Sequence, residues 1–167
     1  MDFLERDLED LIFNTDNETL NNRGLYIEGK KYRQLRIGNY GIADIVTFNR
    51  VPNTNRLLIT VYELKKSRIG VDSFMQAVGY VKGITRYLES RTGKKFEIQT
   101  KIILVGKHIE YGTNFTFLED FISYFKLESY IYNYDIDGLT FTQIDGYLLK
   151  DEGFKNKLKW ELTDLIK

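Results

Sequence analysis

GIADIVTF, Gly41–Phe48, is followed by LLITVYELK, Leu57–Lys65, and these two stretches decide the fold of this chain. Both are rich in β-branched and aromatic residues, which favour strands. The connection between them, residues 49–56, holds the only proline of the chain together with three asparagines, a composition typical of a turn. The pattern predicts two neighbouring antiparallel strands joined as a β-hairpin.

The predicted hairpin brings two acidic side chains together. If the turn is centred at Asn53 and Thr54, antiparallel pairing places Asp44 opposite Glu63. Side chains two apart on a strand share a face, so Glu63 and Lys65 point the same way. Neighbouring carboxylates repel each other unless a cation lies between them, and the cluster therefore suits a divalent metal and a phosphodiester. The alternative is a plain salt bridge between Glu63 and Lys65.

Composition limits the kind of protein and the kind of metal site. The chain has 167 residues with 43% apolar content, enough for one core, and we expect a single domain over residues 1–167. It has no cysteine and one histidine, His108, which excludes thiolate zinc sites and paired imidazole ligands. Any metal would be held by oxygen, which favours Mg²⁺ or Mn²⁺. The sequence predicts no signal peptide and no membrane span, and hence a cytoplasmic protein.

The formal net charge is zero, but the charge is unevenly distributed. Residues 1–22 carry one basic and seven acidic side chains, whereas residues 65–107 carry ten basic and three acidic ones. Basic charge therefore gathers around and after Glu63–Lys65, where a phosphate backbone would have to lie if the cluster were catalytic. A solvated basic face is the alternative interpretation.

The remaining periodicity predicts helices and strands around this hairpin. Strand, long helix and strand form a crossover unit, which is expected to be parallel and right-handed. The other predicted elements are a helix at Phe3–Phe13, a strand at Tyr32–Ile37, the long helix at Val71–Arg91, a central strand at Phe96–Val105, a short helix at Leu118–Phe125, a hairpin around Asp135–Gly138 and a closing helix at Asp151–Ile166.

The long helix carries more specific expectations. Asp72 or Ser73 is the expected N-cap. Gly79 and Gly83 form a small-xxx-small pair, which indicates close packing of the helix rather than a phosphate cradle. The inner stripe of the helix is expected to include Met75, Val78, Val81 and Leu88.

Four short motifs, in this order, resemble those of the PD-(D/E)XK nuclease superfamily. They are Glu5–Leu8 in the opening helix, Gly41–Asp44, Glu63–Lys65, and Gln76 with Tyr80 in the long helix. Within the superfamily the chain is most similar to the RecB-type branch and to the nuclease domains of archaeal mismatch endonucleases and Holliday-junction resolvases. The resemblance covers residues 2–106, and Ala43 replaces the usual proline before the first acid. It implies an α/β fold with a restriction-endonuclease-like core, in which helices flank a central mixed β-sheet, and metal-dependent cleavage of nucleic acid.

The resemblance also implies roles for individual residues. Asp44 and Glu63 would donate carboxylate oxygens to Mg²⁺ at roughly 2.0–2.1 Å, and the backbone carbonyl of Leu64 would complete the set. Lys65 would hold or deprotonate the attacking water and offset the charge on the phosphorane. Glu5 is the expected helix acid near the metal, and Glu9, one turn on, is the alternative. Both acids also suit a solvent-facing position near a helix start.

Further residues are expected to support the substrate. Gln76 and Tyr80 are four apart and share a helix face, with the glutamine near the metal or substrate and the tyrosine beside it. Tyr80 also fits a half-buried position in an amphipathic helix. Lys66 and Arg68 follow the lysine of the motif and are expected to touch phosphates, or else to lie in a solvated loop. His108 is expected to have no role in the site.

The function expected from this resemblance is that of a magnesium-dependent hydrolase, an endonuclease acting on DNA. RNA is the alternative substrate. The alternative to an enzyme is a binding module, that is, a non-catalytic member of the same fold that binds nucleic acid or a protein partner. Cutting both strands would need two active sites, so a homodimer is plausible.

Overall fold

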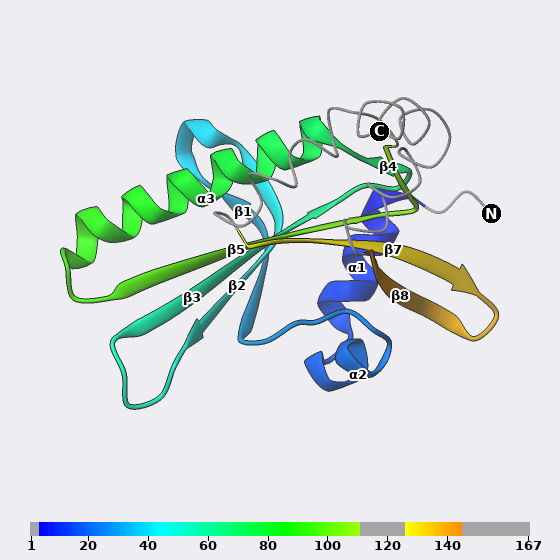
Figure 1. Cartoon of the computed structure of the whole chain (residues 1–167), viewed down its shortest axis with the longest axis horizontal. Coiled ribbons are helices and arrows are strands. Elements are labelled where there is room, and N and C mark those ends of the chain that lie inside the picture. Colours follow the sequence, from blue (N-terminus) through cyan, green and yellow to red (C-terminus); the bar gives the residue numbers. More distant parts are fainter. Residues whose placement is uncertain (1–3, 111–125, 145–167) are drawn as a thin grey trace, which may run out of the picture.

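The computed structural model describes residues 4–110 and 126–144, whose longer strands form a six-stranded mixed sheet flanked by helices (Figure 1). The strand order is β1-β2-β3-β5-β7-β8. The helices are α1 (Glu5–Asn14), α2 (Asn17–Asn22), the 3-10 turn η1 (Gly38–Tyr40) and α3 (Val71–Thr92). The strands of the large sheet are β1 (Lys30–Arg36), β2 (Ile42–Arg50), β3 (Arg56–Leu64), β5 (Glu97–Gly106), β7 (Leu127–Asp135) and β8 (Gly138–Ile144). Strands β4 (Arg68–Ile69) and β6 (His108–Ile109) form a separate two-stranded sheet.

The register of the β2–β3 hairpin is the one that the sequence predicts. Ile45 pairs with Tyr62 and Val46 with Val61 in an antiparallel ladder. Continuing this ladder by one residue sets Asp44 opposite Glu63. The prediction of the hairpin and of its register is therefore confirmed.

The crossover unit is confirmed as well. Strands β3 and β5 are parallel, and α3 connects them along the chain (Figure 1). Strand β7 continues the parallel part of the sheet beside β5, and β8 returns antiparallel to β7. The turn between β7 and β8 lies where the sequence predicts it, and Gly138 there has a φ of +105°, which glycine adopts without strain.

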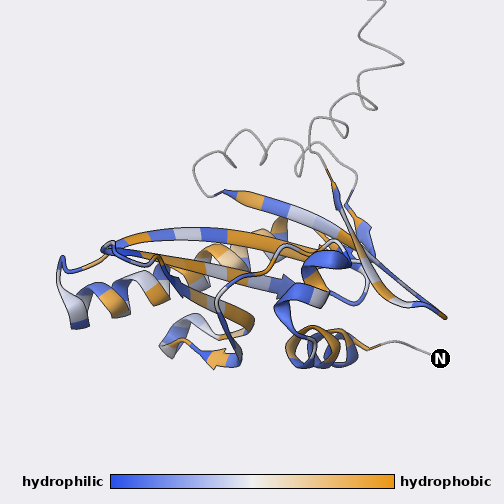
Figure 2. Cartoon of the chain, turned by 90° about the horizontal axis from the view of Figure 1, so that it is seen from below, coloured by the Kyte–Doolittle hydropathy of each residue, from blue (hydrophilic) through white to orange (hydrophobic). Residues whose placement is uncertain are grey.

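Alternation of side chains along the strands produces one apolar cluster on each face of the sheet. Ile59 and Val61 of β3 face α3 together with Ile102 and Leu104 of β5. Their neighbours on the same strands, among them Tyr62 and Leu64, pack instead with Leu8 and Ile12 of α1. Figure 2 shows the alternation of hydrophobic and hydrophilic residues along the helices and strands. Apolar burial in each cluster holds its helices against the sheet. The two clusters thereby determine where α1 and α3 lie relative to the ends of β2 and β3.

One expectation for the long helix is wrong, and a second is wrong at one residue. The N-cap of α3 is Gly70, which makes no side-chain cap, so neither Asp72 nor Ser73 has that role. Met75 is 58% exposed, whereas the predicted inner stripe would bury it. The buried residues of α3 are Ser73, Phe74, Ala77, Tyr80, Val81, Gly83 and Ile84. Val81 is buried, and Val78 and Leu88 are partly buried against the same cluster, so of the four residues in the predicted stripe only Met75 is misplaced.

Two predicted helices cannot be compared with the structure. The expected helices at 118–125 and 151–166 lie outside the described residues. Within residues 4–110 and 126–144, no helix is both long and apolar enough to cross a membrane.

Candidate active site

The first acid and the acid-x-lysine motif meet at the end of the β2–β3 hairpin. Asp44 Oδ2 accepts a hydrogen bond from the backbone N–H of Leu64, with 2.9 Å between the two atoms. Asp44 is partly buried, whereas the side chain of Leu64 is fully buried in the cluster under α1. The hairpin register therefore holds the carboxylate of Asp44 against the backbone of the second motif.

Glu63 is the most enclosed acid of the site. It is 1% exposed, and its Oε1 lies 2.6 Å from Nζ of Lys65. Its other oxygen, Oε2, is buried and has no hydrogen-bond partner among the described residues. A buried carboxylate oxygen without a donor is costly. One half of Glu63 is thus satisfied by the ammonium group, and the other half is left for a cation or a proton.

Burial shifts the pKa of both acids upward. Desolvation raises the pKa of Asp44 to about 6, and the hydrogen bond from Leu64 and the charge of Lys65 offset this only in part. Desolvation, and then the charge of Asp44, raises the pKa of Glu63 to about 7. Burial alone would lower the pKa of Lys65, but the hydrogen bond with Glu63 and the carboxylates of Glu63, Glu5 and Asp44 raise it. The shift of the pKa of Lys65 favours its ammonium form, whereas the shifts of the two acids favour their protonation.

The two candidate helix acids, Glu5 and Glu9, differ in their partners. Glu5 lies beside the motif, with Oε1 at 4.0 Å from Nζ of Lys65 and Oε2 at 3.3 Å from the backbone nitrogen of Lys66. Glu9 is buried and is held by β1, because Oε1 accepts from Arg33 at 2.8 Å and Oε2 accepts from Gln34 at 2.5 Å. Of the two, Glu5 has the carboxylate that reaches the acid-x-lysine segment.

Gln76 and Tyr80 contact each other on α3, as their spacing predicts. Nε2 of Gln76 donates to the hydroxyl of Tyr80 at 2.7 Å. Gln76 is exposed, whereas Tyr80 is 2% exposed and belongs to the core under α3. Burial is the first cause of the raised pKa of Tyr80, and the charges of Glu63 and Asp44 add to it. The ring of Tyr80 is thus a core residue, while its hydroxyl lies within the field of the acids.

The two basic residues after the motif are placed differently from Lys65. Lys66 has an exposed side chain, and its backbone nitrogen and oxygen contact Glu5 and the hydroxyl of Tyr132, respectively. Arg68 lies on β4, and its guanidinium group is 3.7 Å from the carboxylate of Glu110. Both side chains are on the surface next to the site, and the guanidinium of Arg68 already has an acidic neighbour.

The donor set suits a cation bound by few protein ligands. Among the described residues, no cluster of three or more His, Cys, Asp or Glu side chains is placed to hold a metal. Asp44 and the unpartnered Oε2 of Glu63 offer two carboxylates, and the carbonyl of Leu64 stays a predicted third ligand. A set of this kind fits Mg²⁺, which keeps several waters and is bound by one or two carboxylates.

Sequence reasoning missed the residues of β1 that hold Glu9. Gln34 has a φ of +47° and lies between the pairs Arg33 with Ile45 and Leu35 with Ala43, across from Asp44. The register is the same on both sides of Gln34, so no residue is inserted there, and its amide donates to Glu9. A positive φ at a non-glycine residue within a strand has no clear sequence signal here. The available signal was the alternation of basic residues along β1, which could have indicated contacts with the acidic helix α1.

Tyr132 is a second residue that sequence reasoning missed. It reaches the site from β7, where its hydroxyl donates to the backbone oxygen of Lys66 at 2.5 Å. The alternating tyrosines of β7 predict one face of a strand, but nothing in them predicts a contact with residues more than sixty positions earlier.

Comparisons of the chain with protein-family models, with curated proteins and with solved structures gave no match. The resemblance to the PD-(D/E)XK superfamily therefore stays a prediction from the sequence motifs, and the fold is described as α/β with a six-stranded mixed sheet flanked by helices.

Proposed function

We propose that this protein is a nuclease that hydrolyses phosphodiester bonds in DNA with Mg²⁺ or Mn²⁺. The observation that carries the proposal is the buried oxygen Oε2 of Glu63, which has no hydrogen-bond partner among the described residues although Asp44 lies across the hairpin and Lys65 contacts Oε1. A purely structural ion pair leaves no reason to bury a second acid and an unsatisfied oxygen beside it. A cation at this point would remove both costs.

The residues of the site have distinct roles in the proposed reaction. Asp44 and Glu63 would hold the cation, together with the carbonyl of Leu64. When bound there, Mg²⁺ or Mn²⁺ supplies Lewis acidity to a phosphoryl oxygen and acidity to a bound water. The raised pKa of Lys65 favours the ammonium form, which suits orientation of the attacking water and compensation of the phosphorane charge better than proton abstraction.

Glu5 and Gln76 complete the proposed site from the two helices. The carboxylate of Glu5, 4.0 Å from Nζ of Lys65, would keep the ammonium group in place or hold a water next to the cation. Gln76 is exposed beside Tyr80 and would donate to the substrate or to a metal-bound water. Lys66 and Arg68 would contact phosphates at the rim, the latter after giving up its contact with Glu110.

Nicking of supercoiled plasmid in the presence of Mg²⁺ or Mn²⁺ tests the proposal. We expect wild-type protein to nick the plasmid, and Glu63→Gln and Lys65→Ala to lose at least about a hundred-fold in rate, as removal of a preorganised charge does. Lys94→Ala, an exposed lysine in the turn after α3, is the matched control and should retain the rate. Nicking that survives in Lys65→Ala, or in EDTA, would contradict the proposal. A parallel digestion of single-stranded RNA separates the RNA alternative.

The alternative function is a non-catalytic module that binds nucleic acid or a protein partner. The observation that favours it is the ion pair of Lys65 with Glu63 at 2.6 Å, combined with the lack of a three-acid cluster in the described part of the chain. In that case divalent metal would not raise the melting temperature. Wild type and site variants would all nick plasmid at the background rate.

A further inference from the structure

A groove of about 910 Å³ lies away from the acids, between the C-terminal half of α3 and strands β1 and β2. Its volume is within the range of roughly 300–1,000 Å³ that is usual for ligand sites. Four aromatic side chains contribute to its lining, namely Tyr32, Tyr40, Phe48 and Tyr87. None of them has a part in the proposed hydrolysis, and the groove therefore calls for an explanation of its own.

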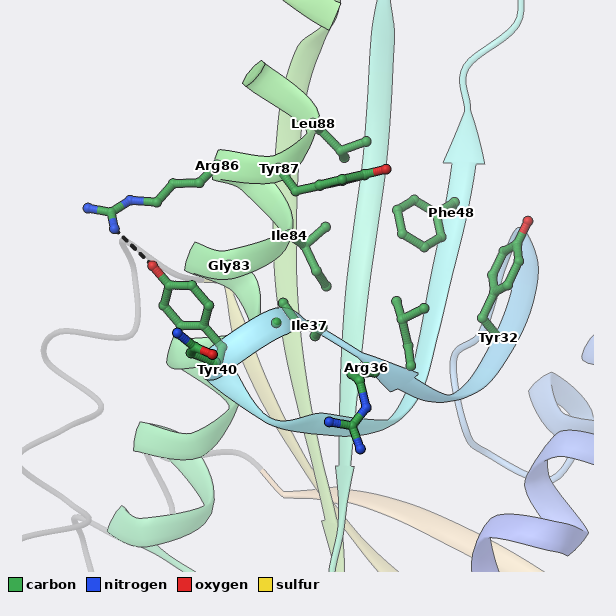
Figure 3. A pocket seen from close by; sticks show the side chains of 13 residues that line it. Tyr32, Arg36, Ile37, Tyr40, Phe48, Gly83, Ile84, Arg86, Tyr87 and Leu88 are labelled. Atoms are coloured by element: carbon green, nitrogen blue, oxygen red, sulfur yellow. Dashed lines mark hydrogen bonds between the residues drawn. The ribbon is translucent and has the colours of Figure 1, made fainter. Parts of the chain in front are cut away.

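The aromatic rings form a row that is open to solvent. Figure 3 shows Tyr87, Phe48 and Tyr32 one after another across the groove. The rings of Tyr32 and Phe48 meet edge to face, with 5.4 Å between centroids and 88° between planes. Tyr32 is 38% exposed and Tyr87 is 59% exposed. The two exposed rings, with the half-buried ring of Phe48 between them, offer apolar surface on which flat groups can stack.

The charge around these rings is positive. Arg36 and Arg86 are the charged residues among the described residues that line the groove. Arg86 donates to the hydroxyl of Tyr40 at 2.8 Å (Figure 3), which fixes both side chains. Arg91 lies 5.6 Å from the ring centroid of Tyr87. The lining thus combines aromatic faces with cations and has no acid, and it complements a polyanion that carries flat groups.

The groove and the candidate active site share α3. Tyr80 contacts Gln76 in the site, and Tyr87 follows on the same helix after about two turns, roughly 10 Å along the axis. Between them, Gly83 lets η1 approach the helix, because a Cβ there would lie 2.6 Å from the ring of Tyr40. Gly41, which follows Tyr40 in the chain, lies against the ring of Tyr80. About two turns of α3 therefore separate the groove from the contact of Gln76 with Tyr80.

We propose that this groove binds a single-stranded segment of nucleic acid, with bases stacked on Tyr87, Phe48 and Tyr32 and phosphates near Arg36 and Arg86. Single strands expose base faces that a duplex hides, and stacking platforms with cations are how proteins hold them without sequence preference. The inference rests on the proposed nuclease function in that it names the form of substrate the site receives.

Equilibrium binding without divalent metal separates the groove from the chemistry. The probe is a dye-labelled oligothymidylate, measured by fluorescence anisotropy in EDTA with the full chain. We expect Tyr87→Ala and Arg36→Ala each to weaken binding by about five- to a hundred-fold, the loss that removal of one stacking or charged contact produces. Tyr87→Phe keeps the ring and should restore most of the affinity. Tyr134→Ala, a tyrosine 53% exposed on the β7–β8 hairpin, is the control and should bind like wild type.

The outcomes distinguish this inference from the proposed function. Equal affinity of wild type, Tyr87→Ala and Arg36→Ala would overturn the inference even if the protein nicks plasmid. Tighter binding of the matched duplex than of the single strand would overturn it too, as would a change from dimer to monomer in Tyr87→Ala with unchanged oligonucleotide affinity. Selective loss of binding in the groove variants supports the inference even if no nuclease activity is found.

Discussion

Asp44 accepts a hydrogen bond from the backbone N–H of Leu64, and this contact ties the acid of β2 to the middle residue of the acid-x-lysine motif on β3. The side chain of Leu64 is buried under α1 while Glu63 and Lys65 lie on the other side of the strand. Packing of one apolar residue therefore sets the positions of its two charged neighbours. The candidate site depends on strand alternation more than on any loop.

Asp44→Asn tests whether the acids hold a cation. The amide oxygen of asparagine can still accept from Leu64, so we expect the variant to fold, whereas loss of the charge should weaken metal binding. Millimolar Mg²⁺ or Mn²⁺ should raise the melting temperature of wild type, because a ligand that binds the folded state stabilises it. The rise should disappear in Asp44→Asn. Differential scanning fluorimetry with each ion, and with Ca²⁺ as a comparison, measures it. An equal rise in wild type and variant contradicts a site at Asp44.

The raised pKa values predict an unusual pH dependence of stability without metal. Because the pKa of Asp44 is about 6 and that of Glu63 about 7 in the folded protein, the folded state binds protons more tightly than the unfolded chain. This contribution is complete below the unfolded pKa of about 4 and is lost as pH rises through the folded values. In EDTA, the free energy of unfolding should fall by roughly 1–3 kcal/mol between about pH 5 and about pH 8.

Two controls accompany the pH series. Glu63→Gln removes one titrating group and should flatten the dependence. Mg²⁺ should restore stability mainly at the higher pH, because a metal binds the deprotonated acids. Urea titrations at several pH values measure these free energies of unfolding. If the free energy of unfolding of wild type in EDTA rises with pH, the pKa values of Asp44 and Glu63 are not raised as described.

Glu5 and Glu9 permit a matched comparison one helical turn apart. Glu9 is 5% exposed and bonded to Arg33 and Gln34, so Glu9→Gln should lower the free energy of unfolding by about 1–3 kcal/mol. The carboxylate of Glu5 is 44% exposed, so Glu5→Gln should leave stability almost unchanged and lower the nicking rate. Urea denaturation and plasmid nicking on both variants check this. The reverse pattern would make Glu9 the functional acid.

Periodicity in the sequence predicted most of the architecture that positions these residues. The alternation in β2 and β3 and the polar turn between them determine the register that sets Asp44 opposite Glu63, because a shift of one residue would expose a whole apolar face. The long α3 and parallel β5 follow from the crossover pattern. These features depend on local composition, which a sequence displays.

The rest depends on contacts between distant segments. Met75 is apolar and fits the predicted stripe, yet it is 58% exposed, whereas its neighbour Phe74 packs in the cluster between α3 and the sheet. The contacts of Gln34 with Glu9 and of Tyr132 with Lys66 likewise join residues far apart in the chain. The sequence motifs favour Glu5 over Glu9 as the helix acid near the metal. The structure separates their partners, because Glu9 contacts Arg33 of β1 whereas Glu5 lies beside Lys65.

Gly79 and Gly83 form the small-xxx-small pair of α3, but only Gly83 lies against another segment. A Cβ at Gly83 would lie 2.5 Å from Ile37 and 2.6 Å from Tyr40, whereas one at Gly79 would meet nothing within 4 Å. Gly83→Ala should therefore destabilise by about 1–3 kcal/mol through overpacking, and Gly79→Ala should stabilise by about 0.5–1 kcal/mol through helix propensity. Urea denaturation measures both. Equal effects of the two substitutions would mean that η1 does not pack on α3 at Gly83, and the wall of the groove around Tyr40 would then be misplaced.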